Sequence, residues 1–205
     1  MGVISNGTTL LDAGSLDSGV ATGAMTLIKT LTASSSSTLS FVHGTSSVVL
    51  DSTYKEYIFK FIDIHPSADE VAFHFNMSAD TGSNYNVTKT STMFRAYHDE
   101  GDSYTALAYL PQQDLAQSTS FQTIGYGTGN DNDQSLSGEL HIFNPASTTF
   151  VKHFISTCNV YEDGDFSIQH FLGGYGNTTS AVDAIQFKMD SGNIDSGTIK
   201  LYGIK

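Results

Sequence analysis

A run of alternating carboxylate and amide side chains, Asp131-Asn132-Asp133, lies in the glycine-rich stretch between Gly127 and Gln134. Such oxygen donors suit Ca²⁺, which takes about six to eight oxygen ligands. The full EF-hand pattern is absent, because the glycine and the distal glutamate do not stand at the required offsets. Aspartate and asparagine also favour turns by bonding their own backbone. We therefore interpret the run as a structural turn. A calcium site at Asp131 and Asp133 is the alternative, and no other cofactor is expected.

The remaining acids and histidines do not form a recognisable catalytic motif. Residues 98–102 and 162–165 are acidic clusters typical of solvated loops, and none of the seven histidines has the HExxH spacing. His141 and His153 could face each other across a predicted hairpin, as hydrogen-bonded structural residues rather than metal ligands. Glycoside hydrolysis needs two carboxylates at a set separation across a cleft, and 21 acidic residues single out no such pair. We therefore expect a protein that is not an enzyme.

Several tyrosines are predicted to lie in or near loops, where they could recognise another surface. A tyrosine offers a flat apolar ring with a polar tip, which suits stacking on sugars and contact with proteins. Loops on a rigid scaffold are a usual place for binding. For any single tyrosine the alternative is simple anchoring of its loop. The candidate recognition residues are Tyr104, Tyr109, Tyr126, Tyr161 and Tyr175.

The composition excludes several classes of partner. The formal net charge is −12 and the isoelectric point about 4.6, so the surface repels nucleic acid and anionic membranes. No stretch approaches the roughly 20 apolar residues that span a bilayer, so no membrane insertion is expected. The single cysteine, Cys158, follows a strand-like run, which predicts a buried and unreactive thiol.

The first 23 residues differ in character from the rest of the chain. They are small and polar, and repeated glycines would break any helix. We interpret residues 1–23 as an extended N-terminal attachment arm, with a disordered tail as the alternative. Scattered apolar residues would anchor such an arm to another surface: Val3, Ile4, Leu10, Leu11, Leu16 and Val20.

From residue 24 onward the chain predicts strands separated by polar turns. Lys55–Ile64 is apolar on both faces, which predicts a strand covered on both sides. Residues 137–144 and 149–161 are typical of a hairpin, and so are 184–190 and 198–204. We expect a short helix at Leu110–Gln117. Many short strands at roughly ten-residue spacing predict an all-β fold, and we expect a jelly-roll β-sandwich over residues 24–205.

Four segments resemble virion proteins of marine tailed bacteriophages: KEYIFKFIDIHP (55–66), FRAYH (94–98), GNDNDQSLSGELHIFNP (129–145) and AVDAIQFKMDSGNIDSGTIKLYGIK (181–205). Proteins of this kind are jelly-roll modules in tail-fibre-like or capsid-decoration roles, without catalytic residues. The resemblance implies assembly and surface recognition. Together with the strand that is apolar on both faces, the arm and the low charge density, it leads us to expect a structural protein located in the virion, which self-associates as a trimer and binds other capsid or tail proteins. The alternative is a receptor-binding module that recognises host-surface glycan through its loops.

Overall fold

The computed structural model describes residues 3–5, 8–12, 15–16 and 24–205, and within them every regular element is a β-strand. The predicted all-β class is therefore confirmed. None of this described part forms a helix that could cross a membrane. The strands are β1 Val3–Ser5, β2 Thr8–Asp12, β3 Ser15–Leu16, β4 Met25–Thr32, β5 Leu39–Val42, β6 Glu56–Pro66, β7 Val71–Ser78, β8 Lys89–Asp99, β9 Thr105–Tyr109, β10 Gln122–Thr128, β11 Leu136–Phe143, β12 Lys152–Glu162, β13 Phe166–Gly176, β14 Ala184–Met189 and β15 Ile194–Ile204.

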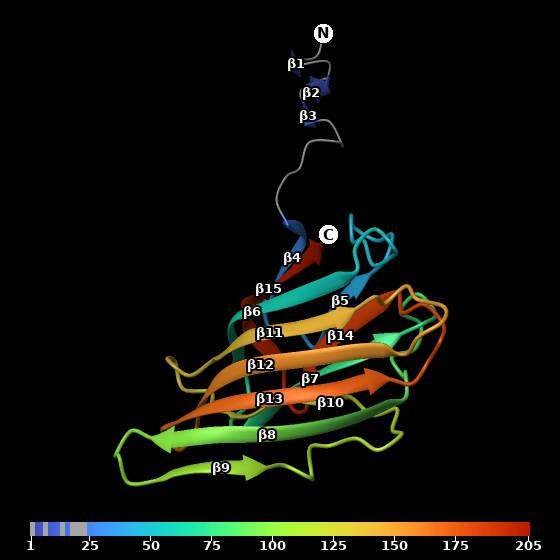
Figure 1. Cartoon of the computed structure of the whole chain (residues 1–205). Coiled ribbons are helices and arrows are strands. Elements are labelled where there is room, and N and C mark those ends of the chain that lie inside the picture. Colours follow the sequence, from blue (N-terminus) through green and yellow to red (C-terminus); the bar gives the residue numbers. More distant parts are fainter. Residues whose placement is uncertain (1–2, 6–7, 13–14, 17–23) are drawn as a thin grey trace.

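Strands β4 to β15 form one antiparallel sheet that folds over into two arms (Figure 1). The long arm has the order β4-β15-β6-β11-β12-β13-β8-β9, and the short arm has the order β10-β7-β14-β5. The two arms join where Thr128 of β10 pairs with Glu162 of β12. Separately, β1, β2 and β3 pair as a small antiparallel sheet.

The core lies between the two arms and is built around aromatic rings. Phe59 and Phe61 of β6 in the long arm contact Phe187 of β14 in the short arm, with ring centroids 5.3 Å apart in both pairs. Phe187 also stacks on Phe73 of β7 at 5.7 Å and meets Phe41 of β5 edge-on at 6.2 Å. All five rings are buried, so their packing holds the arms together.

Strand β6 is covered on both faces along only part of its length, because a β-bulge at Asp63 interrupts it. Ile58 is buried on the outward side, but Ile62 is 39% exposed. Asp63 adopts a φ of 50°, and the pairing register with β11 shifts at the same point. The extra residue turns Ile64 inward, where it is fully buried. The expectation that this strand is covered along its whole length on both faces is therefore wrong at Ile62.

The hairpin between residues 137–144 and 149–161 is confirmed as β11 and β12, but the predicted hairpin near the C-terminus is wrong. Strand β14 pairs with β5 and β7, whereas β15 pairs with β4 and β6. The intervening segment bonds to the β6–β7 turn and to the start of β7 instead of closing on itself. Ala72 N donates to Asp190 Oδ1 at 3.0 Å, and Ser67 N donates to Asn193 O at 3.0 Å. The chain thus crosses from one arm to the other.

The short helix expected at Leu110–Gln117 is replaced by turns. Asp114 Oδ1 accepts a hydrogen bond from Met93 N at 2.7 Å, and the Gln113 carbonyl accepts one from the Gln122 side chain at 3.0 Å. Gln117 has a φ of 49°, in the left-handed region. The Gln113 carbonyl, which a local helix would pair within itself, is thus taken up by a distant side chain.

Two lysines are buried at one end of the long arm. Lys89 and Lys152 both pair with Gly176 on the strand between them, and both are fully buried. Lys89 Nζ donates to Asn76 Oδ1 at 2.5 Å and to the Val87 carbonyl at 2.7 Å. Within the described residues neither ammonium has an ion pair with a carboxylate. Burial lowers the pKa of Lys89 to about 7 and also lowers that of Lys152.

Cys158 is buried, as predicted, and its thiol donates to the Ile124 carbonyl at 3.2 Å. Burial raises the pKa of this thiol far above its usual value, because the thiolate would lose its hydration in the core. The residue therefore behaves as a small core side chain and not as a nucleophile.

The buried ammonium of Lys89 should make stability rise with pH. The native state binds fewer protons than the unfolded state between the folded pKa of about 7 and the usual value of 10.5. The free energy of unfolding should therefore increase from pH 7 to 9.5, by up to about 1.4 kcal/mol per pH unit. Urea unfolding at several pH values measures this slope. Lys89→Met should flatten it, whereas Lys55→Met, at an exposed position, should leave it unchanged. Equal slopes in the wild type and Lys89→Met would contradict the prediction.

Candidate functional site

The long arm turns one face away from the core, here called the outer face. In β12, odd-numbered residues from His153 to Asn159 are exposed, whereas the even-numbered residues are buried. Residues that are paired across neighbouring antiparallel strands share a face, so the register extends this outer face over β6, β11, β13, β8 and β9. The titratable cluster and the exposed aromatic residues discussed below both lie on it.

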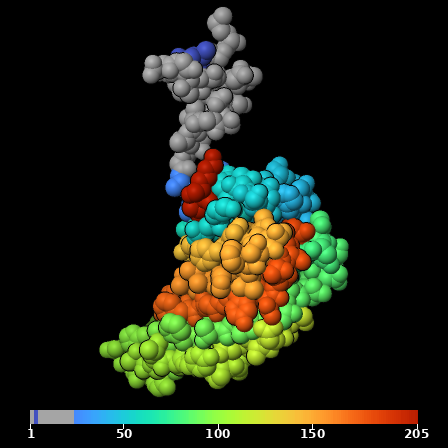
Figure 2. All heavy atoms as spheres, turned by 45° about the vertical axis from the view of Figure 1, so that its right-hand side comes forward, coloured from blue at the N-terminus to red at the C-terminus, as the bar shows by residue number. Residues whose placement is uncertain are grey.

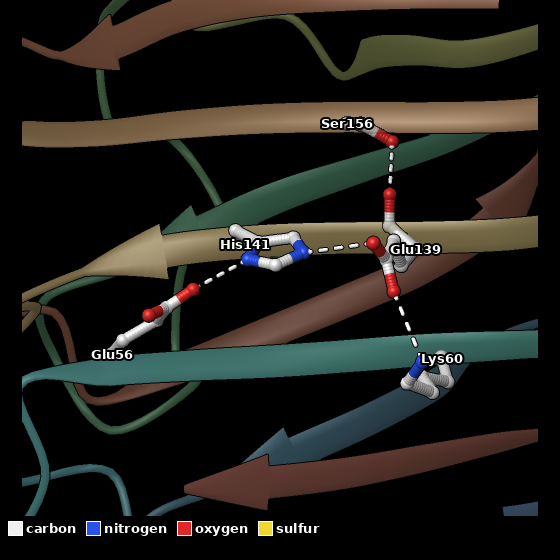
Figure 3. Close-up of polar contacts among 5 residues, drawn as sticks. All are labelled: Glu56, Lys60, Glu139, His141 and Ser156. Carbon is white, nitrogen blue, oxygen red and sulfur yellow. Dashed lines mark hydrogen bonds and ion pairs between the residues drawn. The ribbon is translucent and has the colours of Figure 1, made fainter. Parts of the chain in front are cut away.

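A charged network links β6 and β11 on the outer face (Figure 3). His141 Nδ1 lies 2.5 Å from Glu56 Oε1, and His141 Nε2 lies 3.1 Å from Glu139 Oε1. The second carboxylate oxygen of Glu139 lies 3.1 Å from Lys60 Nζ. The Ser156 hydroxyl donates to the Glu139 backbone carbonyl at 2.6 Å and thereby ties the neighbouring strand β12 to the cluster. Strand pairing positions all of these groups.

The network is internally satisfied, which limits its chemistry. Both ring nitrogens of His141 face carboxylates of the chain itself, so neither is available to move a proton on a bound substrate. Burial alone would raise the pKa of the Glu139 carboxyl, but hydrogen bonds from His141 and Lys60 outweigh it and leave that pKa lowered. The arrangement keeps Glu139 ionised and crosslinks strands, as expected of a structural ion network.

The two histidines predicted to face each other across the β11–β12 hairpin do not do so. His141 pairs with Ile155, two residues beyond His153. His153 instead packs beside Tyr175 of β13, with ring centroids 6.2 Å apart. The hairpin itself was predicted, but its register depends on contacts with β6 and β13 that the local sequence does not reveal.

A row of aromatic side chains crosses the other half of the outer face. Thr157, Phe171, Phe94 and Tyr109 are successive cross-strand partners on β12, β13, β8 and β9. The rings of Phe94 and Phe171 stack at 4.8 Å with planes 12° apart. Phe94 is 41% exposed and Tyr109 is 57% exposed. The coloured bands of β12, β13 and β8 follow one another over one surface in Figure 2.

Polar groups and shallow hollows flank this row. The Tyr109 hydroxyl donates to Asp114 Oδ2. The Thr92 hydroxyl donates to the Tyr109 hydroxyl at 3.4 Å. On one side, a hollow of about 320 Å³ is lined by Thr90, Ser91, Thr92, His153, Gly173, Gly174 and Tyr175. On the other side, Asn159 and Gln169 line a hollow of about 360 Å³ that reaches Ile62 and Glu139. Asn159 also lines a third hollow, of about 390 Å³, with His98 and Tyr161.

The five candidate tyrosines come from separate segments. Tyr109, Tyr161 and Tyr175 point outward from β9, β12 and β13. Tyr104 lies in the β8–β9 turn and packs against Tyr97 and Phe166, and Tyr126 is half-buried in β10 of the short arm. Sequence reasoning missed Phe94, which is exposed on the outer face, and Phe171, which stacks on it. Alternation in β8 could not have placed Phe94 outward, because the charged residues Lys89 and Arg95 lie on the opposite face, and its stacking partner required the strand pairing.

The candidate calcium residues lie in a closed turn. Asp131 N donates to Gln134 Oε1 at 3.0 Å, and Gln134 N donates to the Asp131 carbonyl at 2.9 Å. Both Asp131 and Asp133 are exposed, and Asp133 borders a polar hollow of about 510 Å³ together with Asp63 and Asp195. In the part of the chain that the structure describes, no three acidic, histidine or cysteine side chains converge as a metal site. Calcium binding at Asp131 and Asp133 remains a prediction.

Residues 98–102, by contrast, use their acids within the turn. Asp99 Oδ1 accepts hydrogen bonds from Ser103 N at 2.9 Å and Tyr104 N at 2.7 Å, and these bonds and that of the Ser103 hydroxyl lower the pKa of the carboxyl. His98 pairs with Asp102 at 3.1 Å on the surface. The cluster thus stabilises its own loop.

Five of the six proposed arm residues lie in the short strands β1, β2 and β3. Val3 and Ile4 of β1 are 54% and 64% exposed. Leu10 and Leu11 belong to β2 and Leu16 belongs to β3, whereas Val20 lies outside the described residues. The anchoring role of these six positions remains a prediction.

Removing one carboxylate tests the structural role of the network. The lowered pKa of Glu139 contributes stability above its usual value of 4.5, and this contribution is lost as the pH falls through the folded pKa. Glu139→Gln should lower the free energy of unfolding by about 0.2–1 kcal/mol at pH 7, since the group is partly exposed, and this deficit should shrink as the pH falls from 4.5 through the folded pKa. Glu70→Gln, at an exposed position, is the matched control. A deficit that persists unchanged at low pH would contradict the prediction.

Comparison with known proteins adds no further constraint. No family model, curated protein or solved structure matches the chain.

Proposed function

We propose that the chain is a non-enzymatic structural protein of a tailed-phage virion. Residues 24–205 form a jelly-roll sandwich, residues 1–23 attach it to a capsid or tail protein, and the chain self-associates as a trimer. One observation carries the proposal. Residues 24–205 have a complete hydrophobic core of their own, yet apolar residues remain exposed on the long arm. Surplus exposed apolar surface marks contact with another molecule.

The strand order supports the jelly-roll assignment. Numbering β4, β5, β6, β7, β10, β11, β14 and β15 from one to eight gives the orders 1-8-3-6 and 2-7-4-5 in the two arms. This is the order of two interlocked Greek keys, the hallmark of a jelly roll. Strands β8 with β9 and β12 with β13 are then insertions that widen one sheet.

The edge strand β4 supports self-association. It is eight residues long, and among the described strands it pairs only with β15. Met25 and Leu27 are 42% and 52% exposed, and Lys29 is its single charged residue. A long edge with exposed apolar residues offers free backbone groups to another chain.

Charge and the satisfied network support a virion role without catalysis. A net charge of −12 disfavours contact with packaged nucleic acid, so the partners we propose are other virion proteins. His141 has both ring nitrogens occupied by Glu56 and Glu139, which argues against its acting as an acid or base.

A second candidate function is recognition of host-surface glycan. Tyr109, which is 57% exposed on β9, favours it, because an exposed aromatic ring beside polar side chains suits sugar stacking. The rings of Phe94 and Phe171 stack on each other beside it. A virion protein can hold both functions on different surfaces, with β4 facing its neighbours and the aromatic row facing the host.

Introducing a charge at the β4 edge should break the oligomer. We expect light scattering of the purified protein to give three times the chain mass of 22.0 kDa, and Leu27→Glu to give a monomer. Phe150→Glu is the control, since Phe150 is 68% exposed in a loop away from β4. A wild-type monomer, or a trimer that survives Leu27→Glu, would overturn the proposed role of β4.

Deleting residues 1–22 tests the attachment arm. The shortened protein should keep the melting temperature of the full chain, because the core lies within residues 24–205. Its incorporation into particles assembled in infected cells should fall at least tenfold, measured by quantitative mass spectrometry of purified virions. Normal incorporation of the shortened protein would contradict an attachment role for residues 1–22.

A further inference from the structure

We propose that Lys89 and Asn76 join covalently, through an isopeptide bond between the side-chain nitrogen of the lysine and the side-chain carbonyl carbon of the asparagine. Lys89 begins β8 of the long arm and Asn76 lies in β7 of the short arm, so the bond ties the two arms of the sheet together. The virion role proposed above does not involve this pair, so the two proposals can fail separately.

The two side chains are held in contact inside the protein. Both residues are fully buried, and Lys89 Nζ donates to Asn76 Oδ1 at 2.5 Å. Because a carbonyl bond measures about 1.23 Å, Asn76 Cγ lies within about 3.7 Å of Nζ. Reacting atoms in a pre-organised site lie about 3–3.5 Å apart. A small rotation of the lysine side chain therefore brings its nitrogen within attacking distance of Cγ.

The hydrogen bonds of Lys89 suit an uncharged amine. Among the described residues its nitrogen has two acceptors, Asn76 Oδ1 and the Val87 carbonyl. An ammonium carries three N–H donors, whereas a neutral amine carries two and keeps a lone pair. Burial lowers the pKa of Lys89 to about 7, so a large share of the amine is neutral at neutral pH. A desolvated neutral lysine is a nucleophile.

Four hydrogen bonds fix the amide of Asn76. Its Nδ2 donates to the Tyr85 carbonyl at 2.6 Å and to the Thr119 carbonyl at 2.9 Å. Its Oδ1 accepts the bond from Lys89 and a second bond from Met77 N at 2.9 Å. These contacts hold the carbonyl side of the amide toward the lysine. They also place the Met77 N–H where it stabilises the oxyanion that forms when an amine adds to Cγ.

The reaction is an amide exchange that needs neither an oxidant nor a cofactor. The lone pair of Lys89 Nζ forms the Nζ–Cγ bond, and in the tetrahedral intermediate a proton passes from Nζ to Asn76 Nδ2. The Cγ–Nδ2 bond then breaks, and ammonia leaves with its electron pair. No carboxylate pairs with Lys89 among the described residues, so no acid side chain relays the proton. The linkage should therefore be slow and should follow folding.

Lys152 supplies a matched control for Lys89. It is also fully buried, and burial also lowers its pKa. Its nitrogen donates to the carbonyls of Phe150 at 2.7 Å and Thr178 at 3.1 Å, which are both backbone groups. Its described contacts thus offer no side-chain amide that could release ammonia.

Intact-mass spectrometry of the full chain, incubated folded or in urea at pH 6 and pH 9, tests the bond. The folded wild type should lose one ammonia, about 17 Da, and should lose it faster at pH 9, where the amine is neutral. Tandem mass spectrometry should find residues 76 and 89 in one branched peptide. Lys89→Met and Asn76→Ala should keep the full mass, whereas Lys152→Met should lose ammonia like the wild type. Circular dichroism verifies that each variant is folded, and Lys89→Met suffices if Asn76→Ala does not fold.

Three results would overturn the inference. The first is that the folded wild type keeps its full mass at both pH values. The second is that the loss persists in Lys89→Met, which assigns it to another asparagine. The third is an equal loss in urea, which shows that the fold does not direct the reaction. A trimer that keeps its full mass removes the bond and leaves the structural role standing. The urea slope predicted above for Lys89 applies to the unlinked chain, because a linked nitrogen no longer titrates.

Discussion

The packing of Phe187 is the constraint on which the rest of the structure depends. This ring, from β14 of the short arm, contacts Phe59 and Phe61 of β6 in the long arm as well as Phe41 and Phe73 of its own arm. Aromatic rings supply large buried areas with preferred relative orientations, so one cluster can fix both the separation and the rotation of two sheet arms. Loss of Phe187 would leave a cavity lined by the other rings, at a cost of about 3–5 kcal/mol.

Because this cluster closes the core from within, the outer face of the long arm is free for other uses. Its two halves differ in chemistry. Around β6 and β11, Glu56, His141, Glu139 and Lys60 neutralise one another and bind the strands together. Across β12, β13, β8 and β9 the outward residues carry no lysine, arginine or carboxylate, and aromatic rings are exposed. The same strand pairing therefore produces a structural network on one half and a surface suited to binding on the other.

The sequence predicted local features well and long-range pairing poorly. Alternation predicted the β11–β12 hairpin, since it depends on neighbouring residues. The separation of β14 from β15 was not predictable, because it depends on bonds from Ser67 and Ala72 to a distant segment. The bulge at Asp63 was likewise not predicted, since no pattern in the neighbouring sequence indicates an aspartate with positive φ. The stack of Phe94 on Phe171 needed the β8–β13 register, which joins residues 77 positions apart.

A cryo-EM reconstruction of the particle that contains this chain would test the account most directly. If the proposed function is right, the chain is part of the virion and β4 contacts a neighbouring copy. The outer face of β12, β13, β8 and β9 is then open to solvent and directed away from the particle. Density in which that face is buried against another subunit would contradict the binding role. Absence of the chain from the particle would contradict the structural role itself.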